Sequence, residues 1–283
     1  MNNAEPTVAA VLRSIGQQLS SRFEAELLLA GVLKCDRARL FAHPETVLSK
    51  SQLKQLNELT AQRIDGVPIA YLLGVREFYG REFIVNPSVL IPRPETELLV
   101  EQALKLPVTA QAHVLDIGTG SGCIILTLAA ERPDWHFTAT DISAQALATA
   151  QRNQRRLDLG DRSITWRKGS GYKAFAAQTN HRFDLIVSNP PYVAEQDPHL
   201  TQGDLRFEPD IALTAGPSGL ELIDELIDQA PAHLNPGGWL LLEHGYDQSE
   251  QVCEQMQQIG FDAVQSRQDL AGHYRVAMGS WQR

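Results

Sequence analysis

A glycine-rich turn between an apolar strand and a helix constrains the fold of this chain more than any other part of its sequence. The turn reads Asp-Ile-Gly-Thr-Gly-Ser-Gly over residues 116–122, after an apolar run and before a helical pattern. Glycine lets a backbone turn sharply from strand to helix and approach a ligand closely. Asp141 follows nineteen residues after Gly122, at the end of the next predicted strand. Together these features predict a nucleoside-binding loop at the carboxyl edge of a parallel sheet, although a tight turn without a ligand is the alternative.

Strand and helix patterns alternate through most of the chain. Seven strands are predicted, at residues 113–117, 137–140, 163–167, 183–188, 239–242, 263–268 and 274–278. Helices are predicted between them, at residues 123–131, 143–157, 219–234 and 248–259. Such alternation is typical of a parallel sheet with helices on both faces, so we predict an α/β protein with a Rossmann-like, seven-stranded sheet.

The first 74 residues follow a different pattern. Apolar residues recur at helical spacing over residues 8–19, Ser21 and Glu24 match a capping box, and another helix is predicted over residues 49–65. These features predict a small all-helical domain. Two similar segments, Arg-Glu-Phe-Tyr at residues 76–79 and Arg-Glu-Phe-Ile-Val at residues 81–85, flank Gly80 and predict a short hairpin. We therefore divide the chain into a helical domain, a hairpin linker and an α/β domain, at residues 1–74, 75–94 and 95–283.

The spacing within the glycine turn bears on the identity of the cofactor. The form is Gly-x-Gly-x-Gly, whereas dinucleotide-binding loops have Gly-x-Gly-x-x-Gly and hold a pyrophosphate at the helix start. S-adenosylmethionine has no phosphate, and the ammonium of its amino-acid tail can use a carboxylate such as Asp116. Asp141 can accept hydrogen bonds from both ribose hydroxyls. The predicted cofactor-binding residues here are Asp116, Gly118, Thr119, Gly120, Ser121, Gly122 and Asp141.

A second motif, Asn189-Pro190-Pro191-Tyr192, ends the strand predicted at residues 183–188. If that strand pairs with the first, both motifs lie at the carboxyl ends of adjacent strands, where open α/β sheets bind ligands. The Asn189 side-chain oxygen and the Pro190 carbonyl can accept the two hydrogens of an NH2 group, and the prolines fix the direction of that carbonyl. Tyr192 offers a flat face to a planar amide or base. The motif predicts methyl transfer to a planar nitrogen, accelerated mainly by alignment.

Other classes of protein remain as alternatives. A NAD-dependent oxidoreductase would need the longer glycine spacing and a proton-relay residue, and neither is evident. A nucleic-acid amine methyltransferase would share the Asn-Pro-Pro-Tyr turn but would need a basic recognition region. A non-catalytic cofactor-binding adaptor is a third alternative, against which the intact Asn189 argues.

The bulk composition narrows the class of protein further. The formal net charge of −9 disfavours direct binding of nucleic acid. The three cysteines are far apart, no histidine and cysteine pair has zinc-ligand spacing, and no apolar run approaches the length of a membrane span. We expect a cytoplasmic, monomeric protein without a metal site or a membrane anchor.

The chain resembles the protein-(glutamine-N5) methyltransferase family over nearly its whole length. The resemblance is carried by the helical block, the glycine turn, the Asn-Pro-Pro-Tyr turn, and the segments Ile91-Pro92-Arg93-Pro94-Glu95-Thr96-Glu97, Glu195-Gln196-Asp197-Pro198-His199-Leu200 and Arg206-Phe207-Glu208-Pro209. The Asn-Pro-Pro-Tyr turn alone is also found in adenine-N6 and guanine-N2 methyltransferases, whereas the proline-arginine-proline segment is far more specific.

The resemblance implies a substrate and a set of roles. The substrate would be the glutamine of the Gly-Gly-Gln tip of class 1 peptide chain release factors, with a ribosomal-protein glutamine as an alternative. The glycine turn and Asp141 would hold S-adenosylmethionine, and Asn189 would touch both cofactor and substrate. Pro190, Pro191 and Tyr192 would shape the slot for the glutamine, and the helical domain would dock the release factor.

The sequence leaves alternative roles for a few further residues. Members of the family carry aromatic residues near the adenine in the loop after the third strand. Tyr172 takes that place here, or else it is a solvent-side loop residue. Arg93 and Glu97 border the substrate entrance or form a surface ion pair with each other at a helix start; we favour the ion pair for Glu97 and leave Arg93 open. We expect His199 and His244 to be loop or surface residues rather than catalytic groups.

Overall fold

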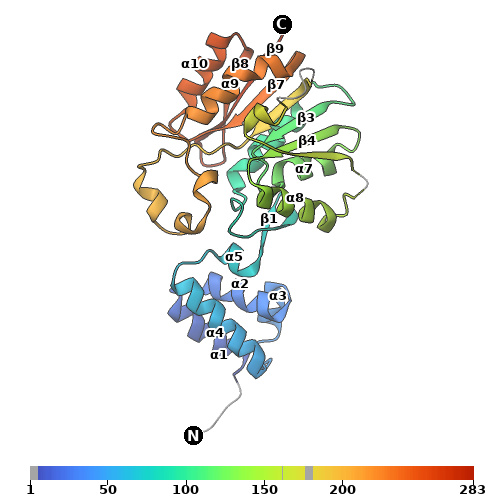
Figure 1. Ribbon diagram of the computed structural model, residues 1–283. Helices are drawn as coiled ribbons and strands as arrows, with labels where there is room; N and C mark the ends of the chain where they lie inside the picture. Colours follow the sequence, from blue (N-terminus) through green and yellow to red (C-terminus); the bar gives the residue numbers. More distant parts are fainter. Residues whose placement is uncertain (1–5, 161, 176–180) are drawn as a thin grey trace. The chain divides into compact units, whose positions relative to one another are not determined.

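The computed structural model describes residues 6–160, 162–175 and 181–283, and its contacts divide the chain into two units (Figure 1). The smaller, here called the helical unit, comprises the residues up to Val75 together with Gln202–Phe207. The larger, the sheet unit, comprises Arg76–Thr201 and Glu208–Arg283. The chain therefore leaves the helical unit after Val75, returns to it for six residues, and leaves it again.

Short helices with interlocking apolar faces build the helical unit. They are α1 (Val8–Gln18), α2 (Arg22–Leu33), α3 (Arg37–Ala42), α4 (Lys50–Ile64) and α5 (Ile69–Leu73). Ser49 and Gln52 form a complete capping box at the start of α4. The expected box at α2 is only half formed, because Ser21 accepts from the backbone N–H of Glu24 but the Glu24 carboxylate turns away to Arg63.

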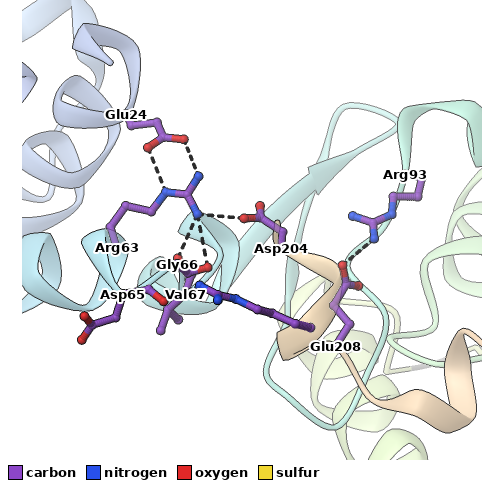
Figure 2. Close-up of polar contacts among 9 residues, drawn as sticks. Glu24, Arg63, Asp65, Gly66, Val67, Arg93, Asp204 and Glu208 are labelled. Carbon is purple, nitrogen blue, oxygen red and sulfur yellow. Dashed lines mark hydrogen bonds and ion pairs between the residues drawn. The ribbon is translucent and has the colours of Figure 1, made fainter. Parts of the chain in front are cut away.

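Arg63, on the last turn of α4, also holds the returning segment Gln202–Phe207. Its guanidinium donates to both carboxylate oxygens of Glu24 at 2.7 and 2.8 Å and to Asp204 at 2.8 Å (Figure 2). Arg206 donates to the backbone carbonyl of Asp65 at 2.6 Å. Arg63 is only 18% exposed at its side chain, so these charge-assisted hydrogen bonds are partly shielded from water. This polar cluster explains why the segment belongs to the helical unit.

A single seven-stranded sheet organises the larger unit. Its strands are β3 (His113–Ile117), β4 (His136–Asp141), β5 (Ile164–Lys168), β6 (Phe183–Ser188), β7 (Leu234–Glu243), β8 (Asp262–Gln268) and β9 (Tyr274–Trp281). The order across the sheet is β5-β4-β3-β6-β7-β9-β8, and the strands from β5 to β7 are parallel. Strand β9 runs antiparallel to both β7 and β8. The prediction of a Rossmann-like, seven-stranded α/β sheet with an N-terminal helical block is confirmed.

Alternation along the strands produces two separate hydrophobic cores. Val114 and Leu185 point into one core with α6 (Glu97–Lys105) and α7 (Cys123–Glu131), whereas their neighbours Leu115 and Ile186 point into the other. The second core is completed by α9 (Glu221–His233) and α10 (Ser249–Ile259). Helix α8 (Ala144–Arg156) packs against β2, β4 and β5.

The hairpin that we expected as a linker belongs, apart from Val75, to the sheet unit. It consists of β1 (Val75–Phe78) and β2 (Arg81–Ile84), joined through Tyr79 and Gly80, whose backbone φ angles are 52° and 70°. Positive φ at both turn positions is the geometry that tight hairpins require. Phe78 and Phe83 are buried in the first core with their ring centroids 6.0 Å apart, and this burial fixes the hairpin to the sheet unit.

The remaining elements are short 3₁₀ turns at Pro94–Thr96, Gly171–Phe175, Pro198–Thr201, Leu205–Phe207 and Asp210–Ala212. Strand β7 begins earlier than predicted, because it continues through Pro236-Gly237-Gly238 with a register shift on β6. Within the described ranges, no helix combines the length and the apolar character that crossing a membrane requires.

Candidate active site

A cavity of about 370 Å³ opens at the carboxyl ends of β3, β4, β5 and β6 in the sheet unit. Ile117 of β3 pairs with Ser188 of β6, so the glycine turn and the Asn-Pro-Pro-Tyr turn leave adjacent strands at the same level. The sequence-predicted residues that line the cavity are Arg93, Gly118, Thr119, Gly120, Ser121, Asp141, Asn189 and Pro191. Asp116, Gly122, Tyr172, Pro190 and Tyr192 are not among its lining residues.

The three glycines of the turn have different structural roles. Gly118, Gly120 and Gly122 all have positive φ, at 72°, 55° and 81°. A Cβ on Gly118 would meet no atom within 4 Å, so its surface stays open for a ligand. A Cβ on Gly122 would lie 2.9 Å from Leu126 and 3.0 Å from Ala150, so this glycine allows α7 and α8 to pack closely. The third glycine is therefore a packing residue and not part of the cavity wall.

Asp141 places a carboxylate in the cavity at the end of β4. Its two oxygens accept backbone N–H groups from Gly120 at 2.9 Å and from Ser143 at 2.8 Å. Burial raises the pKa of Asp141, while the two backbone hydrogen bonds act in the opposite direction. Carboxylate oxygens have further lone pairs, so Asp141 can still accept hydrogen bonds from a ligand.

Asp116 lies behind the glycine turn, fully buried. Its Oδ2 accepts the hydroxyl of Thr119 at 2.6 Å, and its Oδ1 has no hydrogen-bond partner among the described residues. Burial, with a smaller contribution from the charge of Asp141, raises the pKa of Asp116 to about 7. A buried acceptor without a partner is costly, so this oxygen fits a site that gains a donor when a ligand binds.

The loop after β5 contributes backbone rather than an aromatic ring to the cavity. Gly169, Ser170 and Gly171 line it. Tyr172 instead turns into the second core, where its ring stacks on His233 at 4.4 Å and its hydroxyl donates to the Leu226 carbonyl at 3.2 Å. Both alternatives considered for Tyr172 need correction, because the core packing places its side chain neither against the cavity nor in solvent.

An apolar wall of the cavity was missed by sequence reasoning. Ile142 lines the cavity although 48% of its surface is exposed. A large apolar side chain directly after Asp141, at the mouth of a cavity, is suited to cover a flat base. The sequence signal that could have identified Ile142 as a site residue is its position directly after Asp141, the acidic residue that ends a strand.

Hydrogen bonds from other elements of the sheet unit hold the Asn-Pro-Pro-Tyr turn in place. The Asn189 side-chain nitrogen donates to the Thr96 hydroxyl at 3.1 Å. The Tyr192 hydroxyl donates to Glu243 at 3.3 Å, and the Tyr192 carbonyl accepts from Gln248 at 3.0 Å. Thr96 lines the cavity as well and is almost fully buried. Thr96 and Glu243 were not predicted as site residues, because nothing local in the sequence links them to the turn.

Arg93 lines the cavity and forms an ion pair with Glu208, whose side chain is fully buried (Figure 2). Glu208 also accepts the backbone N–H of Ile91 at 2.9 Å, so one carboxylate fixes the segment that leads into α6. The alternative partner considered for Arg93 was Glu97. Glu97 instead accepts the backbone N–H of Tyr79 at 2.9 Å and so ties α6 to the hairpin.

The two histidines have different environments. His199 is an exposed loop residue beside Asp197, with 2.7 Å between its Nδ1 and a carboxylate oxygen. His244 lies in the loop after β7, which is one of the two expected positions, but it is fully buried and so is not a surface residue. It follows β7 directly, and its ring donates to the Gly245 carbonyl at 2.8 Å and accepts from Ser266 at 3.2 Å. These contacts make His244 a structural residue.

Together, the cavity residues fit S-adenosylmethionine. Asp141 suits the ribose hydroxyls and Ile142 suits the base. Asp116 does not line the cavity, but its buried oxygen without a partner among the described residues would favour a nearby ammonium group. The open backbone at Gly118 and Gly120 allows the close approach that such a ligand needs.

Comparison with known proteins agrees with this geometry. The family models described as "PrmC N-terminal domain" and "Methyltransferase small domain" match residues 8–74 and 94–204. A release factor glutamine methyltransferase of Xylella fastidiosa is 47% identical over 275 residues, which cover 97% of this chain and 98% of that protein. The enzyme of the same name from Pseudomonas aeruginosa is 45% identical over 265 residues, which are 93% of each chain.

The fold is also similar to that of solved methyltransferase structures. The 16S rRNA N2 G1207 methyltransferase of Thermus thermophilus, solved with S-adenosylmethionine and guanosine, is 20% identical and has a TM-score of 0.52 over 74% of this chain and 50% of that one. This likeness concerns the fold alone. The enzymes of Xylella fastidiosa and Pseudomonas aeruginosa are 47% and 45% identical to this chain over nearly its whole length, and this similarity establishes the family. The chain is a member of the release factor glutamine methyltransferases.

Proposed function

We propose that this protein transfers a methyl group from S-adenosylmethionine to the side-chain amide nitrogen N5 of the glutamine in the Gly-Gly-Gln motif of class 1 peptide chain release factors. The observation that carries the proposal is the position of Asn189. Its amide lies at the cavity wall next to the glycine turn, and its nitrogen is already bonded to Thr96. Its oxygen therefore remains as an acceptor for the NH2 group of an incoming amide.

The residues of this chain act mainly by binding and alignment. When bound, S-adenosylmethionine supplies an electrophilic methyl group on its sulfonium. The turn over residues 118–121 and Asp141 would hold it with this group toward Asn189. Asn189 Oδ1 and the Pro190 carbonyl would accept the two hydrogens of the glutamine NH2, which directs the nitrogen lone pair at the methyl group. As the methyl group passes from sulfur to nitrogen and leaves S-adenosylhomocysteine, the same acceptors would stabilise the positive charge that develops on nitrogen, and the extra amide proton would then pass to water.

The buried side of the turn supports this assignment for Pro190 and Tyr192. Pro190 is buried and does not line the cavity, so its ring would not contact a ligand, and the role that we assign to it is that of its carbonyl alone. The Tyr192 ring packs against the second core and its hydroxyl is bonded to Glu243, so Tyr192 would shape the slot from behind rather than by stacking across it. Pro191 lines the cavity and would contact the substrate directly.

The partner of the reaction is a protein. We propose that the helical unit docks the release factor, that the enzyme acts as a monomer in the cytoplasm, and that it does not bind nucleic acid directly. The net charge of −9 supports the last point. The relatives named as release factor glutamine methyltransferases, matched along nearly the whole chain, support the choice of substrate.

Mass spectrometry of the substrate tests the proposal directly. The purified chain is incubated with S-adenosylmethionine and a class 1 release factor, and the Gly-Gly-Gln peptide is sequenced by fragmentation. A mass gain of one methyl group on the glutamine is expected, and none when that glutamine is replaced by glutamate, which has no NH2 group. Methylation of rRNA, DNA or a ribosomal-protein glutamine, with none on the release factor, would overturn the proposal.

The Asn189→Ala variant tests the mechanism within the same assay. We expect kcat to fall by roughly 100- to 1000-fold, as for the loss of a group that acts on developing charge, with little change in cofactor affinity. An unchanged kcat would remove Asn189 from the mechanism.

A further inference from the structure

We propose that Asn153 is a positioning residue for S-adenosylmethionine, because its side chain joins the glycine turn to a second segment of the cavity lining. Asn153 lies on α8, is fully buried and does not itself line the cavity. The second segment, residues 84–90, here called the wall segment, starts at the end of β2 and includes the cavity-lining residues 88–90. The inference rests on the proposed function only for the identity of the cofactor.

Three hydrogen bonds connect the Asn153 amide to the backbone of these two segments. Its Nδ2 donates to the Ser121 carbonyl at 2.8 Å, and Ser121 lines the cavity. The same nitrogen donates to the Ile84 carbonyl at 3.0 Å, and Asn153 Oδ1 accepts the Ile84 N–H at 2.6 Å. Ser121 and Ile84 are thus joined through a single side chain that belongs to neither segment.

The chemistry of the three partners specifies a carboxamide at this position. Two carbonyls require two N–H donors, one N–H requires an acceptor, and the side chain of asparagine offers this set. Asn153→Asp would remove both donors, and Asn153→Ala would remove all three hydrogen bonds. Either change would leave the carbonyl of Ser121, a buried residue, without this donor.

Asn153 holds the glycine turn at the end where the turn enters α7. The carbonyl of Gly122, the N-cap residue, accepts a helical hydrogen bond, so the Ser121 carbonyl lies just ahead of the helical ladder. The other end of the turn is held from β4, where the Thr140 carbonyl accepts the N–H of Gly118 at 2.9 Å. The turn is therefore fixed at both ends by different elements.

One helical turn earlier on α8, Thr149 holds the wall segment at a second point. Asn86 Nδ2 donates to the Thr149 hydroxyl at 3.0 Å. The Asn86 side-chain oxygen accepts the N–H of Ser88 at 2.9 Å, and Ser88 lines the cavity. Residues four apart share a helix face. One face of α8 therefore fixes the wall segment twice and, through Asn153, the glycine turn.

This connection lowers the ordering cost of cofactor binding. Without Asn153, the wall segment and the end of the glycine turn would move independently, and a ligand would have to order both when it binds. With Asn153, that order is already part of the folded protein. Ile84 does not line the cavity, yet a ligand that steadies the glycine turn should also steady Ile84 through the shared side chain.

Calorimetric titration with S-adenosylhomocysteine tests the inference. For Asn153→Ala we expect the Kd to rise by roughly 10- to 50-fold, as for the loss of buried hydrogen bonds that the bound state needs. At saturating S-adenosylmethionine, kcat per folded enzyme should stay within about threefold of wild type, because Asn153 touches no reacting group. A residue with a structural role alone would lower the folded fraction and leave the Kd of the folded protein unchanged, and that result would overturn the inference.

Gln154, the next residue on α8, provides a matched control. Its Nε2 donates to the carbonyls of Leu159 at 3.1 Å and Arg162 at 2.9 Å, and its Oε1 accepts from the Trp166 ring at 3.2 Å. This side chain makes the same set of bonds as Asn153, but to partners that do not line the cavity. Gln154→Ala should leave the Kd within about twofold of wild type. An equal rise in both variants would refute the specific role of Asn153.

A measurement on the unaltered protein covers the case in which Asn153→Ala does not fold. Amide hydrogen exchange is followed by NMR with and without saturating S-adenosylhomocysteine, and we expect exchange of the Ile84 N–H to slow by roughly fivefold or more. The His113 N–H controls for a general gain in stability, because it also donates to a side chain, that of Asp184 at 2.8 Å, but at the start of β3.

The exchange rates have a clear opposite outcome. Exchange at Ile84 that does not change with ligand, or that slows only as much as at His113, would refute the inference. A wild-type protein that binds S-adenosylhomocysteine but does not methylate the release factor would refute the proposed function, and would leave both the affinity and the exchange test of Asn153 intact.

Discussion

The backbone N–H of Gly120 donates to the Asp141 carboxylate at 2.9 Å, so the glycine turn after β3 and the acid that ends β4 are held together by a direct hydrogen bond. The second oxygen of Asp141 accepts the N–H of Ser143 in the same way. One carboxylate therefore fixes the shape of two loops while its remaining lone pairs face the cavity.

The first prediction concerns Asp141→Asn. The variant loses the charge that strengthens hydrogen bonds from ribose hydroxyls, so the Kd for S-adenosylhomocysteine should rise by roughly 10- to 100-fold. Isothermal titration calorimetry measures this directly. Ser143→Ala is the control, because Ser143 caps α8 through the N–H of Ala146 and its loss should cost about 1 kcal/mol of stability with little effect on affinity. Similar Kd values for the two variants would contradict the role of Asp141.

The second prediction compares Gly122→Ala with Gly118→Ala. Both place a side chain at positive φ, but only the Cβ at position 122 collides with Leu126 and Ala150. We expect Gly122→Ala to reduce the free energy of unfolding by about 2–4 kcal/mol and Gly118→Ala by only about 1–2 kcal/mol. Cofactor affinity should show the opposite order for the folded proteins, because Gly118 faces the cavity. Chemical denaturation and calorimetry give both quantities.

The third prediction concerns Tyr172→Phe. The Tyr172 hydroxyl donates a hydrogen bond to the Leu226 carbonyl, and the ring lies in the second core. The variant should therefore lose about 1 kcal/mol of stability and bind S-adenosylhomocysteine as the wild type does. A clear loss of affinity at unchanged stability would place Tyr172 at the adenine after all.

The fourth prediction is a pH dependence of stability. Burial raises the pKa of Glu243 from an ordinary value near 4.5 to about 7, so between these values the folded protein binds a proton that the unfolded chain has lost. The stability from this group is complete below pH 4.5 and is lost as the pH rises through about 7. The free energy of unfolding of Glu243→Gln, relative to wild type, should therefore increase by about 1–3 kcal/mol from pH 5.5 to pH 8.

Comparing the free energies of unfolding of the two proteins separates the contribution of Glu243 from that of Asp116. Burial also raises the pKa of Asp116 to about 7, but Asp116 contributes equally to both proteins and cancels from their difference. Urea denaturation of the two proteins at both pH values provides the test. A difference that stays constant with pH would show that Glu243 titrates normally in the folded state.

The parts of the fold that were predictable are those encoded by local patterns. Each of three features is encoded within one short segment: the apolar run 113–117, the glycine turn, and Asp141. The order of strands and helices could likewise be predicted from the spacing of apolar residues along the chain. The placement of the Asn-Pro-Pro-Tyr turn beside the glycine turn required one further assumption, the pairing of β3 with β6, which the register of Ile117 with Ser188 confirms.

The parts that could not be predicted depend on contacts between distant segments. Thr96 meets Asn189 across 93 residues, and Glu208 meets the Ile91 backbone across 117 residues. A threonine or a glutamate in isolation carries no mark of such a partner. Tyr172 was misplaced for the same reason, since the stacking partner that draws it into the core is His233 on α9.

The return of Gln202–Phe207 to the helical unit has a consequence for how this gene can change. A single cut after Val75 would remove Arg63 and the Asp65 carbonyl, which are the partners of Asp204 and Arg206. The N-terminal helices therefore cannot be gained, lost or exchanged by one recombination event without also altering the loop that follows the Asn-Pro-Pro-Tyr turn. We expect the two regions to be inherited together, and chimaeras that swap the helices alone to need residues 202–207 from the same donor.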